Sequence, residues 1–322
     1  MKIIFFGSAQ FAVSSLKAIL DAGYDISCVV TQPDKAKGRG LHLEGTPVKV
    51  AAQEAGIKIY QPKEVNSAQS IELFKKLGPE LFVVIAYGQI LAQEVLDIPR
   101  LMVINAHASL LPKYRGAAPI NWAIINGERE TGITIMKVIR KMDAGPIIAQ
   151  AKLGIKENDD ECTLEKELAK LAAELSLRAI KAIKGNNIKL VLQDNAKATY
   201  APKLKKENGL LDWGKSAQEV CNLIRGVCGW PGAFTYYRGK ILKIYESQGL
   251  SPEKAISFYE GTVPKNISSG QVINISKDGI LVACGSGALL INELQIEGKR
   301  VMLAQEFISG HKICVGDIFG KK

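Results

Sequence analysis

Long apolar runs, paired cysteines and nucleotide-binding glycine motifs are all missing from this chain of 322 residues. The composition, 47% hydrophobic and 23% charged, is typical of globular domains. No apolar run approaches the roughly 18 residues that span a bilayer. The run over residues 3–6 is too short for the core of a secretory signal. We therefore expect a cytoplasmic protein that does not associate with a membrane.

The six cysteines and three histidines follow no metal-binding spacing. The cysteines, at positions 28, 162, 221, 228, 284 and 314, are at least seven residues apart, and no C-x-x-C motif occurs. A disulfide framework is typical of small secreted domains rather than of a cytoplasmic chain this long. The sequence thus predicts reduced thiols and no metal site.

The turn after the first predicted strand lacks the glycines of a dinucleotide site. The fingerprint G-x-G-x-x-G needs its second glycine so that the backbone can approach a pyrophosphate. After Gly7, alanines occupy the second and third glycine positions, Ala9 and Ala12. A G-x-x-x-x-G-K-[ST] motif is also absent. These absences argue against NAD and ATP, and we expect the turn to line another ligand.

The first half of the chain does contain an alternation of short apolar strands with amphipathic helices. Strands are predicted over 2–6, 26–31, 57–60, 81–86 and 101–104, followed by a strand pair over 133–139 and 147–153. Helices are predicted over 11–20 and 163–184, where apolar residues recur at helical spacing. Such alternation favours βαβ units and a mostly parallel sheet covered on both faces. We predict an α/β, Rossmann-like, doubly wound domain over residues 1–190.

Beyond residue 190 the composition changes. Lysines among small and polar residues predict an extended basic linker over 191–207. A helix is predicted over 217–225, followed by strands over 233–237, 241–245, 271–276, 280–283 and 288–294. Short strands with glycine turns favour a small β-barrel, so we predict an OB-like domain over 208–322. The net charge of +10, denser in the second part, suits an anionic partner, although ordinary solvated lysines are the alternative.

The most informative stretch, residues 103–112, follows a predicted strand. Asn105 and His107 are two residues apart, so in an extended backbone both side chains point to the same side. Open α/β sheets bind ligands at the carboxyl ends of their strands. A further polar group, Asp143, lies in the turn 141–146. Each residue alone also fits a structural role, as a packed histidine or a turn former. Only together do they predict a site.

These residues resemble the signature of the 10-formyltetrahydrofolate-dependent formyltransferases. The shared pattern is Asn105-x-His107, the stretch SLLPKYRGAAPI over 109–120, and Asp143. Other segments are similar in order and spacing to the family members that act on methionyl-tRNA: 31–34, 38–40, 47–49, 86–88, 131–136, 211–213 and 230–231. The resemblance covers nearly the whole chain. The Asn-x-His…Asp pattern implies the reaction, and the other segments imply the acceptor.

The resemblance implies transfer of the formyl group of 10-formyltetrahydrofolate to the α-amino group of methionine on initiator methionyl-tRNA. The amine itself attacks the formyl carbon, so neither a metal nor a nucleophilic side chain is required. Asn105 would donate to the oxygen that becomes negative, and His107 would donate to it or carry the proton of the amine. Asp143 would orient His107, favour its charged form, or accept a proton through water. The sequence leaves these roles open.

The resemblance also implies where both substrates bind. The folate slot is expected from main-chain groups of two segments, namely Ile85, Ala86, Tyr87 and Gly88, and Ser109, Leu110, Leu111 and Pro112. The alternative for the second segment is a buried loop packed on the sheet. The tRNA is expected at basic residues of a loop and of the linker, namely Lys35, Lys37 and Arg39, and Lys203, Lys205 and Lys206. The OB-like domain would hold tRNA through its phosphates. The alternative is a set of solvated surface lysines.

One segment departs from the family pattern. The family usually has Thr-Pro-Asp/Glu after the first strand, whereas this chain has Ser8-Ala9-Gln10 and so lacks an acidic side chain there. Two other functions stay open: a folate-dependent formyltransferase or hydrolase acting on a small molecule, and an RNA-binding protein without activity. The basic loop argues against the first, and the intact Asn105, His107 and Asp143 argue against the second. A monomer is expected from the tendency of the family.

Overall fold

The computed structural model describes residues 1–37, 42–257 and 267–320 of the chain. Contacts between residues divide the chain into two compact units. Unit 1 comprises Met1–Pro119, Glu130–Ile155 and Thr163–Pro202, and unit 2 comprises Ile120–Arg129, Lys156–Cys162 and Lys203–Lys322. Unit 2 therefore combines the C-terminal part of the chain with two short segments that precede it in the sequence.

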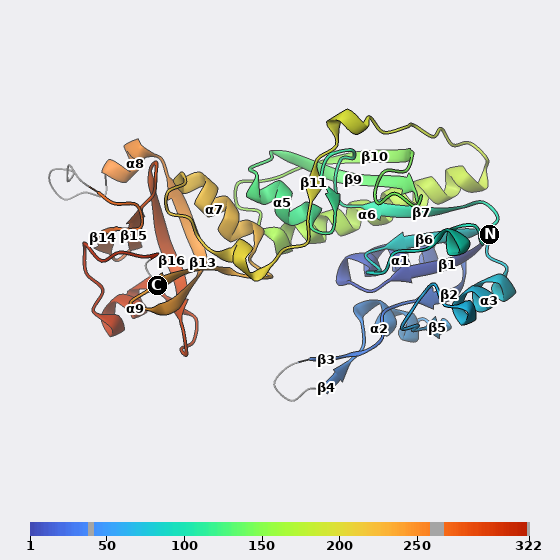
Figure 1. Ribbon diagram of the computed structural model, residues 1–322, viewed down its shortest axis with the longest axis horizontal. Helices are drawn as coiled ribbons and strands as arrows, with labels where there is room; N and C mark the ends of the chain where they lie inside the picture. The colour runs from blue at the N-terminus through green and yellow to red at the C-terminus, as the bar shows by residue number, and fades with distance from the viewer. Residues whose placement is uncertain (38–41, 258–266, 321–322) are drawn as a thin grey trace. The chain divides into compact units, whose positions relative to one another are not determined.

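The sheet of unit 1 has seven strands in the order β10-β9-β7-β6-β1-β2-β5, which can be followed in Figure 1. They are β1 (Lys2–Gly7), β2 (Asp25–Val30), β5 (Ile59–Tyr60), β6 (Leu81–Ile85), β7 (Met102–His107), β9 (Glu130–Lys137) and β10 (Ile147–Gly154). The strands from β5 to β7 run parallel, whereas β9 and β10 are each antiparallel to their neighbours. The predicted Rossmann-like, mostly parallel sheet is confirmed, and every predicted strand end lies within three residues of the observed one.

Helices connect or follow the strands of unit 1. They are α1 (Gln10–Asp21), α2 (Pro47–Glu54), α3 (Ala68–Leu77), α4 (Gln93–Leu96) and α6 (Glu161–Lys184). The Thr46 hydroxyl accepts from the backbone N–H of Lys49 at the start of α2, which satisfies one of the free donors of the first turn. Helices α1 and α6 confirm the two that the sequence predicts. The three shorter helices are not predicted.

Two short strand pairs complete unit 1. β3 (Lys35–Lys37) pairs antiparallel with β4 (His42–Glu44), so these lysines lie in a hairpin and not in the predicted free loop. Figure 1 shows this hairpin extending away from the rest of unit 1. β8 (Arg115–Gly116) pairs parallel with β11 (Tyr200–Ala201), which attaches part of the predicted linker to unit 1. The predicted extended linker is therefore only partly extended, because 3-10 turns at Asn195–Lys197 and Lys206–Gly209 interrupt it.

The sheet of unit 2 is antiparallel, in the order β12-β13-β16-β15-β14, with β17 paired to β16. Its strands are β12 (Ala233–Tyr237), β13 (Lys240–Leu250), β14 (Val272–Ser276), β15 (Gly279–Ala283), β16 (Ala288–Ile296) and β17 (Met302–Leu303). The helices are α5 (Pro119–Ile125), α7 (Ala217–Gly226), α8 (Pro252–Ile256) and α9 (Ala304–His311). The predicted helix and the predicted strands are confirmed, while closure into an OB-like barrel stays a prediction.

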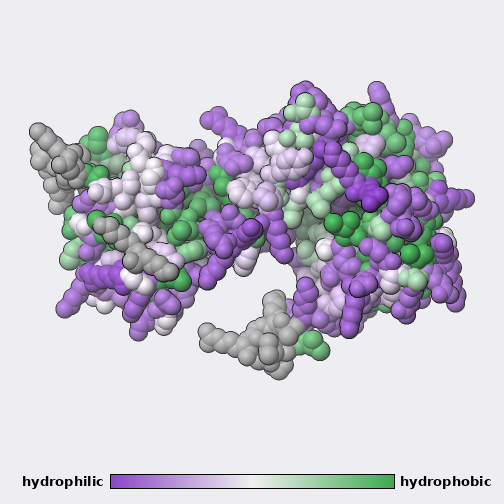
Figure 2. Space-filling view, in the orientation of Figure 1, coloured by the Kyte–Doolittle hydropathy of each residue, from purple (hydrophilic) through white to green (hydrophobic). Residues whose placement is uncertain are grey.

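Each unit has its own packed core. In unit 1 the rings of Phe6, Phe74 and Phe82 contact one another with centroids 4.9 to 5.8 Å apart. In unit 2 the Trp213 ring packs on Phe319, with centroids 6.0 Å apart. Figure 2 shows hydrophilic residues over much of the visible surface of both units, with apolar residues between them. Within the described ranges, no helix has the length and apolar character needed to cross a membrane.

Candidate active site

Strand β7 carries Asn105 and His107 at its carboxyl end, inside the sheet of unit 1. Asn105 is paired with Met136 and His107 with Thr134 on the neighbouring β9, so the two side chains lie on the same face. His107 is 6% exposed, and Asn105 is half-buried. The Asn105 amide has no hydrogen-bond partner within the described part of the chain. Its N–H groups are therefore available to a ligand.

The structure brings Asp143 against His107. Asp143 lies in the loop between β9 and β10, and its Oδ2 is 3.7 Å from the Nδ1 of His107. The other ring nitrogen, Nε2, is 2.9 Å from the backbone oxygen of Tyr114. A carbonyl oxygen can only accept a hydrogen bond, so Nε2 is protonated and donates a hydrogen bond to the backbone oxygen of Tyr114. The other nitrogen, Nδ1, is the one that faces the carboxylate.

The backbone of β8 fixes the carboxylate of Asp143. The N–H of Gly116 donates to Oδ2 of Asp143 at 2.8 Å. Gly116 has a φ of +126°, and a Cβ there would meet the carbonyl oxygen of Ala201 at 2.5 Å. Only glycine fits this position, because any side chain would separate β8 from β11. The glycine of the stretch 109–120 thus supports the geometry of the site.

The segment 109–112 is held by a hydroxyl network that the sequence did not indicate. The Thr134 hydroxyl donates to the backbone oxygen of Ser109 at 2.6 Å and accepts from the N–H of Leu111 at 3.1 Å. The Gln150 amide donates to the same hydroxyl and to the backbone oxygen of Leu111. Ser109 and Leu111 are buried, while Leu110 and Pro112 are half-buried. The main chain here is rigidly placed, as a slot for a flat ring requires.

At the end of β6, backbone groups rather than side chains are exposed to solvent. Ile85 and Tyr87 are buried, and the Tyr87 ring packs against Phe6 at 5.5 Å. Burial also raises the pKa of the Tyr87 phenol far above its ordinary value, so the phenol stays protonated. Ala86 and Gly88 are exposed and both have positive φ, +46° and +93°. The part of this segment that faces solvent is therefore close to bare main chain.

Ser8, in the segment that departs from the family pattern, links three strand ends. Its hydroxyl donates to the backbone oxygen of Tyr87 at 3.0 Å and accepts from the N–H of Gln32 at 3.1 Å. The backbone N–H groups of Ser8 and Ala9 both lie within hydrogen-bond distance of the oxygen of Ala86. The turn after β1 thus supports the end of β6 through hydroxyl and backbone bonds, without an acidic side chain.

The basic residues expected to bind tRNA occupy two places. Lys35 is exposed in β3, the backbone of Lys37 pairs with His42, and Arg39 lies outside the described residues. Asp34, directly before β3, accepts from Lys49 at 2.5 Å and from Gln61 at 2.7 Å. These two bonds, that of Lys49 first, hold the pKa of Asp34 below its ordinary value. The second group, Lys203, Lys205 and Lys206, is exposed in unit 2.

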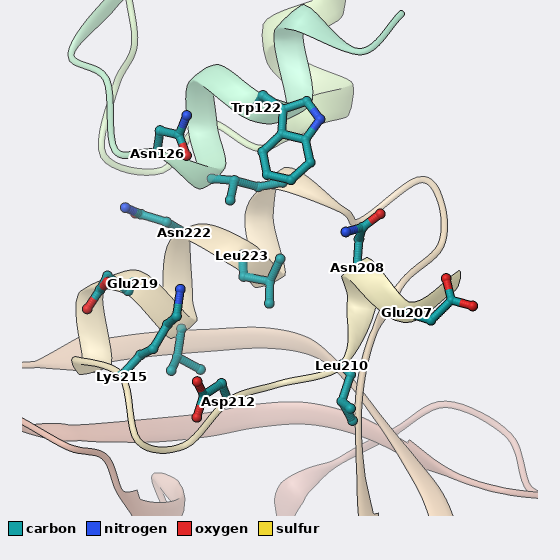
Figure 3. A pocket seen from close by; sticks show the side chains of 12 residues that line it. Trp122, Asn126, Glu207, Asn208, Leu210, Asp212, Lys215, Glu219, Asn222 and Leu223 are labelled. Carbon is teal, nitrogen blue, oxygen red and sulfur yellow. The ribbon is translucent and has the colours of Figure 1, made fainter. Parts of the chain in front are cut away.

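A cavity of about 660 Å³ lies in unit 2, and none of the three residues above lines it (Figure 3). Trp122 of α5 and Asn126, which directly follows α5, face Asn222 and Leu223 of α7 across it. Several of its polar groups have local partners: Asn222 accepts from Gln218 and Arg225, and others cap the ends of nearby turns. Because none of Asn105, His107 and Asp143 lines the cavity, we do not assign the reaction to it.

The fold also brings together two cysteines that are far apart in sequence. The sulfurs of Cys162 and Cys228 are 3.7 Å apart, and Asp160 lies beside them. Among the described residues these three form the one group with metal-ligand spacing, which the sequence analysis missed because no motif links them. Burial raises the pKa of Cys162 to about 12 and also raises that of Cys228. Both side chains are therefore thiols at neutral pH, the form that binds metals poorly.

The chain is similar in sequence to known proteins. Residues 1–180 match the family model described as formyl transferase, and residues 203–312 match that of the formyl transferase C-terminal domain. A methionyl-tRNA formyltransferase of Caldanaerobacter subterraneus subsp. tengcongensis is 45% identical over 319 residues, covering 99% of each chain. A protein of the same name from Acetivibrio thermocellus is 42% identical, covering 100% of each chain.

Solved structures share the fold at low sequence identity. The sugar 3N-formyl transferase WlaRD, solved with dTDP and 5-N-formyl-THF, has a TM-score of 0.66 and 21% identity, over 93% of this chain and 99% of that one. HypX from Aquifex aeolicus, solved with tetrahydrofolic acid, has a TM-score of 0.61 and 17% identity, over 100% of this chain and 51% of that one. At such identities the likeness is one of fold.

Proposed function

We infer the reaction from the premise that this chain belongs to the formyl transferase family. It is an enzyme that transfers a formyl group from 10-formyltetrahydrofolate to the α-amino group of methionine on initiator methionyl-tRNA. The product is the N-formylmethionyl-tRNA used to begin translation. The observation that carries this function is the similarity over nearly the whole length to methionyl-tRNA formyltransferases, at 40 to 45% identity.

The site supports a mechanism in which the protein stabilises charge and moves one proton. As the amine attacks the formyl carbon, negative charge develops on the formyl oxygen. Asn105, whose amide has no partner among the described residues, donates to that oxygen. Nδ1 of His107 takes the proton that the attacking nitrogen loses and passes it to N10 of the departing folate. Asp143, 3.7 Å away, stabilises the imidazolium formed in between.

The folate lies against rigid main chain in this proposal. The pterin ring packs against the main chain at Ala86 and Gly88 and over 109–112, where Thr134 and Gln150 already bind the N–H and C=O of Leu111. Hydrogen bonds with Thr134 and Gln150 hold the segment 109–112 in place. Because these groups are already placed, little ordering is needed when the ring binds.

We assign residues 1–190 to catalysis, 191–207 to a basic linker and 208–322 to an OB-like domain that binds tRNA. Lys35, Lys37 and Arg39 approach the acceptor end of the tRNA. Lys203, Lys205 and Lys206 contact its phosphates, which makes binding weaken steeply with added salt. The enzyme acts as a monomer and requires no metal, because the amine of the substrate is the nucleophile.

The test is transfer of labelled formyl from 10-formyltetrahydrofolate to Met-tRNA, comparing initiator with elongator. We expect labelling of the initiator alone, and its loss in His107→Ala. His311→Ala, which removes a histidine of unit 2, is the matched control and should retain transfer. If neither tRNA is labelled while a small amine is, the acceptor assignment is wrong and the folate chemistry stands.

A further inference from the structure

Arg115 is an unusual residue because it is a buried cation without an acidic partner. Its side chain is 2% exposed, and arginine is rarely buried unless it is paired. Within the described residues, its guanidinium meets no carboxylate. Nε and Nη2 donate to the Gln193 side-chain oxygen at 3.1 and 2.7 Å, and Nη2 also donates to the Asn195 side-chain oxygen at 2.9 Å. Two side-chain amide oxygens thus take the place of the carboxylate that normally pairs with a buried arginine.

Gln193 has every polar group engaged, and Arg115 sets its orientation. The side-chain nitrogen of Gln193 donates to the backbone oxygens of Asp143, at 2.9 Å, and Gly145, at 2.7 Å. A guanidinium only donates and a carbonyl only accepts. If the amide were turned over, its NH2 would face the guanidinium and its oxygen would face two carbonyl oxygens. Arg115 therefore forces the NH2 of Gln193 toward the loop that carries Asp143.

Asp143 needs such support. Its φ of +50° lies in the left-handed region, which side chains other than glycine adopt rarely and which the surroundings must enforce. Arg115 and Gly116 are neighbours in β8, so one strand acts on Asp143 twice. Gly116 binds the carboxylate directly, and Arg115 binds the backbone of Asp143 through Gln193. All of these residues lie in unit 1.

We propose that Arg115 and Gln193 form a clamp that positions Asp143 against His107. Both are positioning residues, since neither lies against the reacting atoms. The proposal rests on the proposed function in naming formyl transfer as the reaction that the clamp serves. Its structural content, that Gln193 holds the Asp143 carboxylate in place, is independent of which acceptor is used.

The decisive variant is Gln193→Glu. Glutamate has nearly the same size and accepts from Arg115, so the buried cation keeps a partner. It cannot donate to Asp143 and Gly145, and its oxygens would repel their carbonyls. Asn195→Asp is the matched control, because it adds the same charge beside Arg115 and leaves the amide of Gln193 unchanged.

Three readouts separate positioning from plain stability. We expect kcat for formyl transfer to fall roughly 10- to 100-fold in Gln193→Glu, the range that a displacement of about 1 Å causes. KM for both substrates should stay close to the wild type, and Asn195→Asp should stay within about twofold in kcat. In Asp143→Asn, adding Gln193→Glu should cost almost nothing more, because Gln193 acts through Asp143.

A signal independent of activity comes from the Gly116 amide, whose N–H binds the Asp143 carboxylate. In 1H–15N spectra its resonance should move in Gln193→Glu toward the position that it takes in Asp143→Ala, and stay in place in Asn195→Asp. An unmoved Gly116 resonance, or full additivity of the two substitutions in kcat, would overturn the clamp. Failure of the wild type to formylate Met-tRNA would instead refute the proposed function, and the Gly116 signal would still decide on the clamp.

Discussion

Unit 1 contains nine of the eleven polar or charged side chains that are buried among the described residues, and unit 2 contains Asn222 and Thr235. Four of the nine, His107, Ser109, Arg115 and Thr134, belong to the networks around β7, β8 and β9. Buried polar groups lower stability unless each is paired. Their concentration at one end of one sheet therefore marks where the fold holds groups for chemistry.

Unit 2 contains the cavity of about 660 Å³ but uses its polar groups differently. Thr235 accepts from the indole N–H of Trp213 at 3.0 Å, and Asn222 accepts from Gln218 and Arg225. These bonds join residues of unit 2 to one another. A cavity alone is thus a poor guide to function, whereas a free donor beside a paired histidine and carboxylate is a good one. Substitutions in the two units should accordingly separate activity from stability.

Asn105→Ala should give the largest effect on activity with the smallest effect on folding. Removing a donor to the developing oxyanion typically lowers kcat by about 100- to 1,000-fold. Because the amide has no partner among the described residues, the free energy of unfolding should hardly change. Single-turnover formyl transfer and urea unfolding measure the two quantities. If Asn105→Ala has the same kcat as the wild type, Asn105 takes no part in the mechanism.

Thr134→Val should affect both stability and folate binding. The substitution keeps the shape of the side chain but removes the hydroxyl that joins Ser109, Leu111 and Gln150. Buried groups left without partners typically cost about 1–3 kcal/mol of the free energy of unfolding. The segment 109–112 should also loosen, so KM for the folate should rise while KM for tRNA stays unchanged. An unchanged folate KM would mean that this segment does not line the slot.

The sequence predicts the strands of unit 1 well because parallel strands buried on both faces appear as continuous apolar runs. Helix α4 has only four residues, too few to show a helical period, whereas α3 is as amphipathic as α1 and was simply not predicted. Spacing and resemblance were enough to predict three site residues, Asn105, His107 and Asp143. What the sequence did not predict is the hairpin of β3 and β4, whose strands have only three residues each.

The supporting residues of the site carry no comparable signal. Thr134 and Gln150 are single polar residues within strands, and Gln193 lies in a segment that shows only a basic composition. Gln193 reaches Asp143 from 50 positions away, and Arg115 reaches Gln193 from 78. Only the folded chain shows that an amide between an arginine and two carbonyls has a single allowed orientation.

Thr235→Val repeats the threonine substitution in unit 2 and should change stability alone. Thr134 and Thr235 are both fully buried, so the two variants differ mainly in what their hydroxyls bind. Thr235→Val leaves the Trp213 N–H unpaired, and we expect a loss of about 1 kcal/mol in urea unfolding. The kcat and both KM values should stay within about twofold of the wild type. A tenfold fall in kcat at unchanged stability would show that unit 2 takes part in chemistry.

Lys49→Met should give the smallest effect, because the pair that it breaks lies at the surface of unit 1. The hydrogen bond from Lys49 is the main cause that lowers the pKa of Asp34. A carboxyl whose folded-state pKa is lowered adds stability above its ordinary pKa of 3.8, and that stability is lost as the pH falls through the lower, folded-state pKa. Lys49→Met should therefore raise the pKa of Asp34 toward 3.8 and reduce the stability gained between acidic and neutral pH.

Carboxyl-carbon NMR of Asp34 across an acid titration measures this change directly. Lys152→Met is the matched control, because Lys152 pairs with Glu130 elsewhere in unit 1 and does not contact Asp34. Gln61 still donates to Asp34 in both variants, so the shift should be partial in Lys49→Met and absent in Lys152→Met. An identical titration of Asp34 in both variants would mean that Gln61, not Lys49, holds this carboxylate. The base of the hairpin would then depend on a neutral bond that is nearly insensitive to salt.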